Sequence, residues 1–263
     1  MDEAGVTSSA TRHPLPRERN LIIAALLVLA TVAWALIIWQ SSSSSDDQMM
    51  RPTAGMTQPV FLGIWVAMMV AMMFPSAAPM ILAFARVEAA RAVRGDVVVP
   101  VTVFVAAYLL VWTAFGAVAF ALASATEALA DHSMWLSDHA GHLGGALMIV
   151  AGAYQLSPLK RACLSKCRLP VSWLLHSWRE GAGGAFRLGV EHGAYCLGCC
   201  WLLFVILFPL GVMNIAAMAL IAALILAEKS LPMSRIAVTG SALALVAYGV
   251  AVLASPALLP TTM

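Results

Sequence analysis

Long apolar runs recur along this chain, and polar segments rich in arginine or acidic residues separate them. A helix needs about 20 such residues to cross the hydrocarbon core of a bilayer. Hydrophobic residues fill 62% of the 263 positions and charged residues 11%, which is more apolar surface than one soluble core can bury. We therefore expect an all-α fold, a polytopic membrane helix bundle with about seven transmembrane helices. The expected spans are 21–39, 59–84, 97–123, 139–156, 193–211, 215–227 and 234–254.

The distribution of positive charge predicts the orientation of this bundle. With these spans, fourteen of the fifteen Lys and Arg residues fall on the side of the amino terminus, and only Arg51 falls on the other. Cytoplasmic loops carry an excess of Lys and Arg, so the amino terminus is expected in the cytoplasm and the protein in a bacterial inner membrane. A net charge of +2 is too small to suggest nucleic-acid binding, which leaves the lipid bilayer as the expected surroundings.

The organisation along the chain follows from these spans. We expect a cytoplasmic tail at 1–20, a first transmembrane anchor at 21–40, a flexible outer loop at 41–58, a six-helix membrane domain at 59–254 and an outer tail at 255–263. Residues 158–192 are expected to form a cytoplasmic loop that carries cysteines. Within it, Val171, Leu174 and Trp178 recur at helical spacing and predict a short amphipathic helix. The anchor would instead be a cleaved signal peptide if the small residues at 41–45 were a cleavage site.

The cysteines are the strongest candidates for chemistry. Cys196, Cys199 and Cys200 stand at i, i+3 and i+4, so on a helix they share one face. Cys163 and Cys167 lie one helical turn apart in the preceding loop and would meet the first three if that loop folds back beneath the bundle. Thiols are kept reduced on the cytoplasmic side, so no disulfide is expected. Thiolates favour Cu(I), Zn(II) or iron–sulfur chemistry over hard cations.

Ionisable residues beside these cysteines extend the candidate site. Glu191 and His192 directly precede the cysteine face, and an interfacial hydrogen-bonding pair is the simpler interpretation of both. Glu228 stands at the inner end of the sixth span and would be a further carboxylate if it turns toward the thiols. Its neighbour Lys229 is long enough to snorkel to the interface instead.

Thioethers and outer histidines complete the possible ligands. Met68, Met72 and Met73 recur at helical spacing in the second span, where a packing surface is the alternative interpretation. His139 and His142 lie one turn apart at the outer end of the fourth span. Ordered by depth, the outer histidines, the methionines and the inner thiols would form a relay for a metal ion. Simple solvation of the outer histidines is the competing interpretation.

The motifs at these positions resemble a bacterial family, the domain of unknown function 2182, whose members are described as predicted metal-binding integral membrane proteins. The residues that carry the resemblance are Trp65, Met68, Ala71, Met72, Met73, Pro75, Cys163, Leu164, Cys167, Arg168, Pro170, His176, Trp178, Arg179, His192, Gly193, Tyr195, Cys196, Gly198, Cys199, Cys200, Trp201, Gly211, Met213, Asn214, Glu228 and Lys229. The resemblance covers roughly 60–235 and implies a multi-pass membrane protein with a Cys and His metal site. Leu203 and Phe204 stand where the family pattern has a methionine soon after Cys-Cys-Trp.

Together these observations favour a membrane protein that binds a soft metal ion, Cu(I) or else zinc, and acts in its transport or delivery. A metal-requiring membrane protein or a soluble metal chaperone would be its partner. The alternatives are a thiol oxidoreductase linked to a quinone or haem, and a structural accessory subunit. An enzyme is not favoured, because the chain has no phosphate-binding loop, no G-x-S-x-G elbow and no H-E-x-x-H helix.

Overall fold

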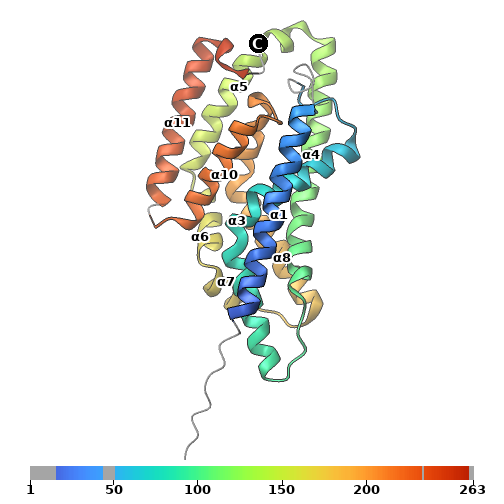
Figure 1. Ribbon diagram of the computed structural model, residues 1–263. Helices are drawn as coiled ribbons and strands as arrows, with labels where there is room; N and C mark the ends of the chain where they lie inside the picture. The colour runs from blue at the N-terminus through green and yellow to red at the C-terminus, as the bar shows by residue number, and fades with distance from the viewer. Residues whose placement is uncertain (1–15, 44–50, 233, 261–263) are drawn as a thin grey trace, which may run out of the picture.

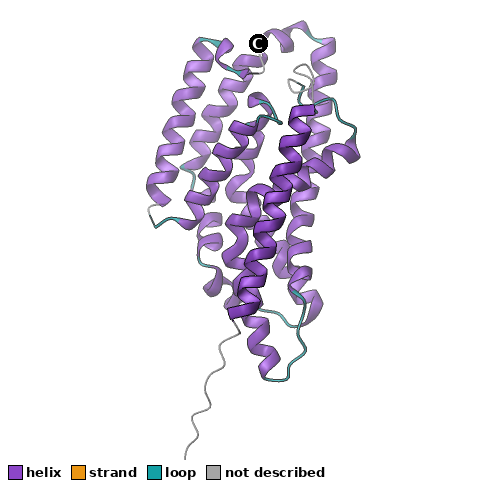
Figure 2. Cartoon of the chain, in the orientation of Figure 1, coloured by secondary structure: helices purple, strands orange, loops and turns teal. Residues whose placement is uncertain are grey.

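The chain folds into a bundle of helices, and the described residues contain no strand (Figure 2). The computed structural model describes residues 16–43, 51–232 and 234–260. Its elements are α1 (Pro16–Ser43), α3 (Gln58–Val93), α4 (Val101–His132), α5 (Met134–Gln155), α6 (Pro158–Arg168), α7 (Pro170–Ser177), α8 (Gly181–Val205), α9 (Leu207–Leu210), α10 (Ile215–Ser230), α11 (Ser234–Ala254) and a 3-10 turn at Pro256–Leu258. Most of the expected tail 1–20, and the serine-rich part of the expected outer loop, lie outside the described residues. So does the end of the expected tail 255–263.

Five helical segments of the described chain are long and apolar enough to cross a membrane: Glu18–Ser43, Gln58–Val93, Val101–His132, Gly181–Leu210 and Ser234–Ala254. The other two expected spans fall in α5 and α10. Helix α5 carries Asp138, His139 and His142 in its first turns, and α10 has 16 residues. At 1.5 Å per residue α10 is about 24 Å long, less than the ~30 Å hydrocarbon core. Seven spans and a cytoplasmic amino terminus therefore stay predictions.

Three helix pairs form the framework of the bundle. Helix α5 packs most extensively on α11, and α4 on α8, while α1 and α3 pack on each other (Figure 1). Small residues permit these close approaches. A Cβ atom on Gly145 would come within 3.0 Å of the Gly249 carbonyl oxygen, and one on Gly189 within 2.4 Å of the Phe104 carbonyl oxygen. Glycine thus allows α5 to approach α11 closely, and it does the same for α8 against α4.

The segment between α5 and α8 is where the structure differs most from expectation. Helix α8 begins at Gly181, well ahead of the expected start of the fifth span at Gly193. Among the glycines at 181–184 only Gly181 takes a positive φ, of 75°, and the helix runs on from it. Residues 158–192 are thus mostly helical. They form α6, α7 and the first turns of α8, which lie in the lower half of Figure 1, away from the carboxyl terminus at the top.

Candidate metal centre

The three cysteines of α8 lie together in the interior of the bundle, on the face that their spacing predicts. The side chains of Cys196, Cys199 and Cys200 are each no more than 1% exposed. The Sγ atoms of Cys199 and Cys200 are 3.2 Å apart, and the Cys199 thiol donates a hydrogen bond to the Cys196 carbonyl oxygen at 3.2 Å. Because α8 begins at Gly181, these residues lie near the middle of the candidate span Gly181–Leu210 and not at its start.

Helix α6 brings a fourth thiol to this group. Ser157 caps α6 by accepting a hydrogen bond from the Lys160 backbone N–H at 3.1 Å, and the helix then packs along α8. Cys167, in its last turn, is buried, and its thiol lies near those of Cys196 and Cys199. The interaction with Cys196, together with burial, raises the pKa of the Cys167 thiol above its ordinary value. The structure therefore places Cys167 of α6 beside the three cysteines of α8, and we call Cys167, Cys196, Cys199 and Cys200 the thiol cluster.

Cys163 takes a different position, although it lies one turn before Cys167 on α6. Its side chain is half-buried, and burial raises the pKa of its thiol. A Cβ atom on Gly198 would come within 2.7 Å of the Cys163 Sγ atom. Cys163 thus packs against the backbone of α8 at Gly198, which stands on a different face of that helix from Cys196 and Cys200.

A buried lysine reaches the thiol cluster from α10. The Nζ atom of Lys229 donates hydrogen bonds to the Cys196 Sγ atom at 3.1 Å and to the Ser76 Oγ atom at 3.3 Å. The hydroxyl of Tyr108, on α4, lies 3.1 Å from the same sulfur. Lys229 is 8% exposed, so it does not snorkel to the interface as the sequence suggested. The sulfur of Cys196, on α8, therefore contacts side chains of α4 and α10, and Lys229 links it to Ser76 on α3.

Glu228, next to Lys229, points into a second buried polar group. Its Oε2 atom is 2.7 Å from the Nζ atom of Lys160, and both side chains are 1% exposed. Gln155 donates to the Glu228 Oε1 atom at 3.0 Å and to the Ser241 Oγ atom at 3.1 Å, and Lys160 also donates to Gln155. The structure thus pairs Glu228 with a lysine of α6. A role for Glu228 as a metal ligand stays a prediction.

His192 lies one turn before Cys196 on α8 and is enclosed by aromatic rings. Its ring is 3% exposed, with the centroids of Phe104 and Tyr108 at 6.0 and 5.7 Å and that of Trp173 at 6.0 Å. The Nδ1 atom is buried and has no hydrogen-bond partner. An unpaired polar atom in such a place is costly and suggests a ligand that would satisfy it.

Glu191 and the methionines occupy different surroundings. Glu191 accepts a hydrogen bond from Arg187 on the partly exposed side of α8, at 2.7 Å. Met68, Met72 and Met73 are all buried in the hydrophobic core. Ser76, which accepts from Lys229, lies one turn beyond Met72 and Met73 on α3. The methionine stripe is therefore on the helix that borders the thiol cluster, whereas the Glu191 carboxylate pairs outward.

The side chains are not arranged as a formed metal site. Within the described ranges, no group of three or more His, Cys, Asp or Glu side chains could hold a metal ion as it stands. The thiols instead make hydrogen bonds with one another, at a sulfur separation of 3.2 Å for Cys199 and Cys200. An ion with bonds near 2.3 Å to each sulfur would need them to turn toward a common centre.

A polar pocket lies beside Trp173, which also contacts His192. It has a volume of about 380 Å³ and is lined by Ser165, Lys166, Leu169, Ser172, Trp173, His176, Ser177 and Tyr195. The Trp173 ring contacts both Tyr195, in this pocket, and His192, beside the thiols. Trp173 therefore belongs both to the wall of the pocket and to the surroundings of His192.

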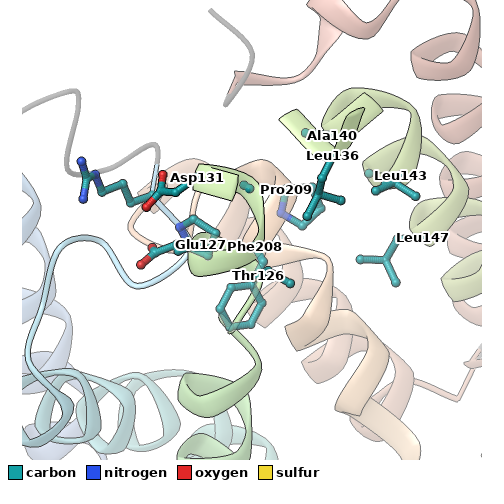
Figure 3. A pocket seen from close by; sticks show the side chains of 13 residues that line it. Thr126, Glu127, Asp131, Leu136, Ala140, Leu143, Leu147, Phe208 and Pro209 are labelled. Carbon is teal, nitrogen blue, oxygen red and sulfur yellow. The ribbon is translucent and has the colours of Figure 1, made fainter. Parts of the chain in front are cut away.

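A larger cavity, of about 530 Å³, lies at the opposite end of the bundle. Figure 3 shows Glu127 and Asp131 on one side of it and Leu143 and Leu147 on the other. Thr53 holds the Glu127 carboxylate through its backbone N–H at 2.7 Å and its hydroxyl at 2.9 Å. This cavity is far along the bundle from α6 and the thiols.

The outer histidines also lie at that end. His139 is exposed, stacks on Trp135 and has its Nδ1 atom 2.8 Å from the Trp135 carbonyl oxygen. The rings of His139 and His142 are 5.9 Å apart between centroids. A first capture of metal there stays a prediction.

Four residues of the centre were not predicted as site residues from the sequence. The length of Lys229 favoured the interface, and no motif pointed to Tyr108, Ser76 or Trp173 as part of the site. Trp173 lies on α7, whose apolar face was read from Val171, Leu174 and Trp178, yet Trp173 is buried and Val171 is exposed. The position of Trp173 in the sequence, between the two cysteine motifs, could have suggested that it belongs to the site.

A comparison with protein families also points to copper. The sequence model of a family described as PpoB2, copper chaperone, matches residues 62–252. No curated protein and no solved structure matches the chain. The match is to a copper-related family, whereas the resemblance implied a metal-binding family without naming the metal, and the match does not identify domain 2182 by name.

Proposed function

We propose, since this chain belongs to the PpoB2 family of copper chaperones, that it binds Cu(I) as cargo in the thiol cluster and delivers it to a copper-requiring protein of the membrane. Cys167, Cys196, Cys199 and Cys200 would supply the sulfur ligands, with His192 able to add a nitrogen. A soluble metal chaperone would be the donor. Zinc is the alternative cargo for the same ligands.

The observation that carries this proposal is the meeting of thiols from two helices. Cys167 of α6 lies near Cys196 and Cys199 of α8, in a site where these thiols are shielded from water. Soft thiolate ligands favour Cu(I), and a buried site protects the ion from exchange with water. The unpaired Nδ1 atom of His192 is a second donor beside this sulfur group.

Binding would replace the hydrogen bonds among the thiols by bonds to the ion. The ligands must lose protons when the metal enters, so uptake releases protons and rearranges the cluster. A site that is not preformed suits a carrier, because the hydrogen-bonded thiols offer a stable state after the ion leaves. This favours delivery over permanent storage. In the alternative role of a transporter, the Cu(I) ion would cross the membrane by way of Met68, Met72 and Met73.

Metal analysis of the purified protein tests this function. Wild-type protein in detergent, loaded with Cu(I) without oxygen and passed through a desalting column, is expected to retain copper. The variant Cys196→Ala/Cys199→Ala/Cys200→Ala should lose it. His139→Ala/His142→Ala, at the far end of the bundle, is the matched control and should keep it. Equal and negligible copper and zinc in wild type and the triple variant would refute the proposal.

The thiol oxidoreductase alternative is less well supported by the geometry. Cys199 and Cys200 are in contact, but they are adjacent residues of a helix, and their Cα atoms are ~3.8 Å apart. Ordinary disulfides join Cα atoms about 4.4–6.8 Å apart, so a Cys199–Cys200 bond would distort α8. Thiol titration before and after an oxidising quinone would detect such chemistry.

A further inference from the structure

The side chain of Lys229 carries an inference that rests on the proposed function and extends it to the choice of metal. Glu228 and Lys229 are neighbours on α10, yet they pair in different directions. Glu228 is engaged by Lys160, while Lys229 contacts Cys196 and Ser76. In the part of the chain that the structure describes, no carboxylate comes within ion-pair distance of Lys229.

A buried ammonium group needs an anionic partner, because the loss of water is costly for an unpaired charge. The groups that Lys229 contacts are a thiol sulfur and a hydroxyl. The thiol cluster is thus where a counter-charge for Lys229 would arise. One Cu(I) ion bound by two thiolates has a net charge of −1, and the ammonium of Lys229 would balance it.

We infer that Lys229 is a specificity-determining residue, a fixed positive charge beside Cys196 that makes the thiol cluster favour a monovalent cation over a divalent one. Coulomb repulsion between the ammonium and the bound ion scales with the charge of the ion. For the same set of thiolates and the same distance, a divalent ion such as Zn²⁺ therefore meets twice the repulsion of Cu⁺. The hydrogen bond to Cys196 places this charge 3.1 Å from a ligand atom, in surroundings from which water is excluded.

The neighbouring contacts keep the ammonium in that position. Ser76 accepts from Lys229 and itself donates to the Met73 carbonyl oxygen at 3.0 Å, which fixes its hydroxyl on α3. Tyr108 approaches the same sulfur from α4. Lys229 is accordingly a positioning residue for Cys196 as well as a charge, and the experiment must separate the two roles.

The test compares affinities for Cu(I), Ag(I) and Zn(II) in wild type, Lys229→Met and Lys229→Arg, measured by competition with chelators in detergent. Lys229→Met removes the charge and keeps a long side chain. We expect it to shift the ratio of zinc to Cu(I) affinity toward zinc by tenfold or more, and the ratio of zinc to Ag(I) affinity likewise. Lys229→Arg keeps the charge and should retain the wild-type preference. Lys229→Gln, which is uncharged but polar, is used in the same way if Lys229→Met does not fold.

The outcomes separate this inference from the proposed function. If removing the charge weakens all three metals in equal proportion, Lys229 is only structural and the inference is overturned while copper binding stands. If Lys229→Arg loses the preference as Lys229→Met does, the charge is not its cause and the inference again fails. If wild type binds none of the three ions, the proposed function and the inference fall together.

Discussion

The Nζ atom of Lys229 lies 3.1 Å from the Sγ atom of Cys196, and this contact joins α10 to α8 inside the bundle. The adjacent Glu228 joins α10 to α6 through Lys160, at 2.7 Å. Helix α6 also carries Cys167 into the thiol cluster. The two buried polar groups thus have α6 and α10 in common. The position of α6 decides both whether the ion pair forms and whether the fourth thiol reaches the others.

The two cysteines of α6 should differ in their importance for copper. Replacing an outer-shell partner commonly costs about 10–100-fold in metal affinity, and loss of a direct ligand should cost at least as much. We expect Cys167→Ala to lower Cu(I) affinity by about tenfold or more. Cys163→Ala, the same change one turn away against Gly198, should have a much smaller effect. Chelator competition measures both, and a larger loss for Cys163→Ala would contradict the assignment of Cys167 to the cluster.

The Lys160 and Glu228 pair should contribute to stability and not to copper binding. Removing one partner of a buried pair leaves an uncompensated charge and costs roughly 3–5 kcal/mol. Glu228→Gln is therefore expected to lower the unfolding temperature in detergent, and Lys160→Met/Glu228→Gln should recover part of the loss because no buried charge is left.

Copper binding by the same double variant tests the other role of Glu228. Retained Cu(I) affinity is expected, since the carboxylate pairs with Lys160 on α6. A loss of affinity in the folded double variant, beyond that caused by lower stability, would show instead that Glu228 is a ligand.

The shared face of Cys196, Cys199 and Cys200 could be predicted because helical spacing alone determines it. The direction of Lys229 could not. A lysine near a helix end can snorkel or turn inward, and only the packing of α10 on α3 and α8 decides between them. The separation of Cys167 from Cys163 likewise depends on how α6 lies against Gly198. Local periodicity gives the faces of each helix, whereas the meeting of those faces is a property of the tertiary packing.

Trp173 should control how fast the ion reaches the cluster. Its ring contacts His192 on one side and lines the polar pocket on the other. We expect Trp173→Ala to open this path and to speed Cu(I) loading from a soluble donor, with little change in equilibrium affinity. Stopped-flow mixing with a coloured Cu(I) chelator as donor measures the rate. Trp135→Ala, an exposed tryptophan stacked on His139 at the other end, is the matched control. Equal loading rates in the three proteins would mean that copper enters by another path.

The contact between α4 and α8 should determine whether the centre can assemble at all. A Cβ atom on Gly189 would come within 2.4 Å of the Phe104 backbone oxygen, so Gly189→Ala must push the helices apart. Overpacking of this kind costs about 1–3 kcal/mol. Because Phe104 and Tyr108 both stack on His192, the displacement should weaken Cu(I) binding as well as stability.

The same substitution elsewhere on α8 provides the control for this last change. A Cβ atom on Gly183 meets nothing within 4 Å, so Gly183→Ala adds a methyl group in open space. Alanine favours a helix over glycine by up to about 1 kcal/mol, and Gly183→Ala should therefore leave the unfolding temperature unchanged or slightly raised. Thermal unfolding in detergent and chelator competition are measured on both variants. Equal unfolding temperatures and equal Cu(I) affinities for Gly189→Ala and Gly183→Ala would show that the close approach of α4 and α8 at Gly189 does not support the centre.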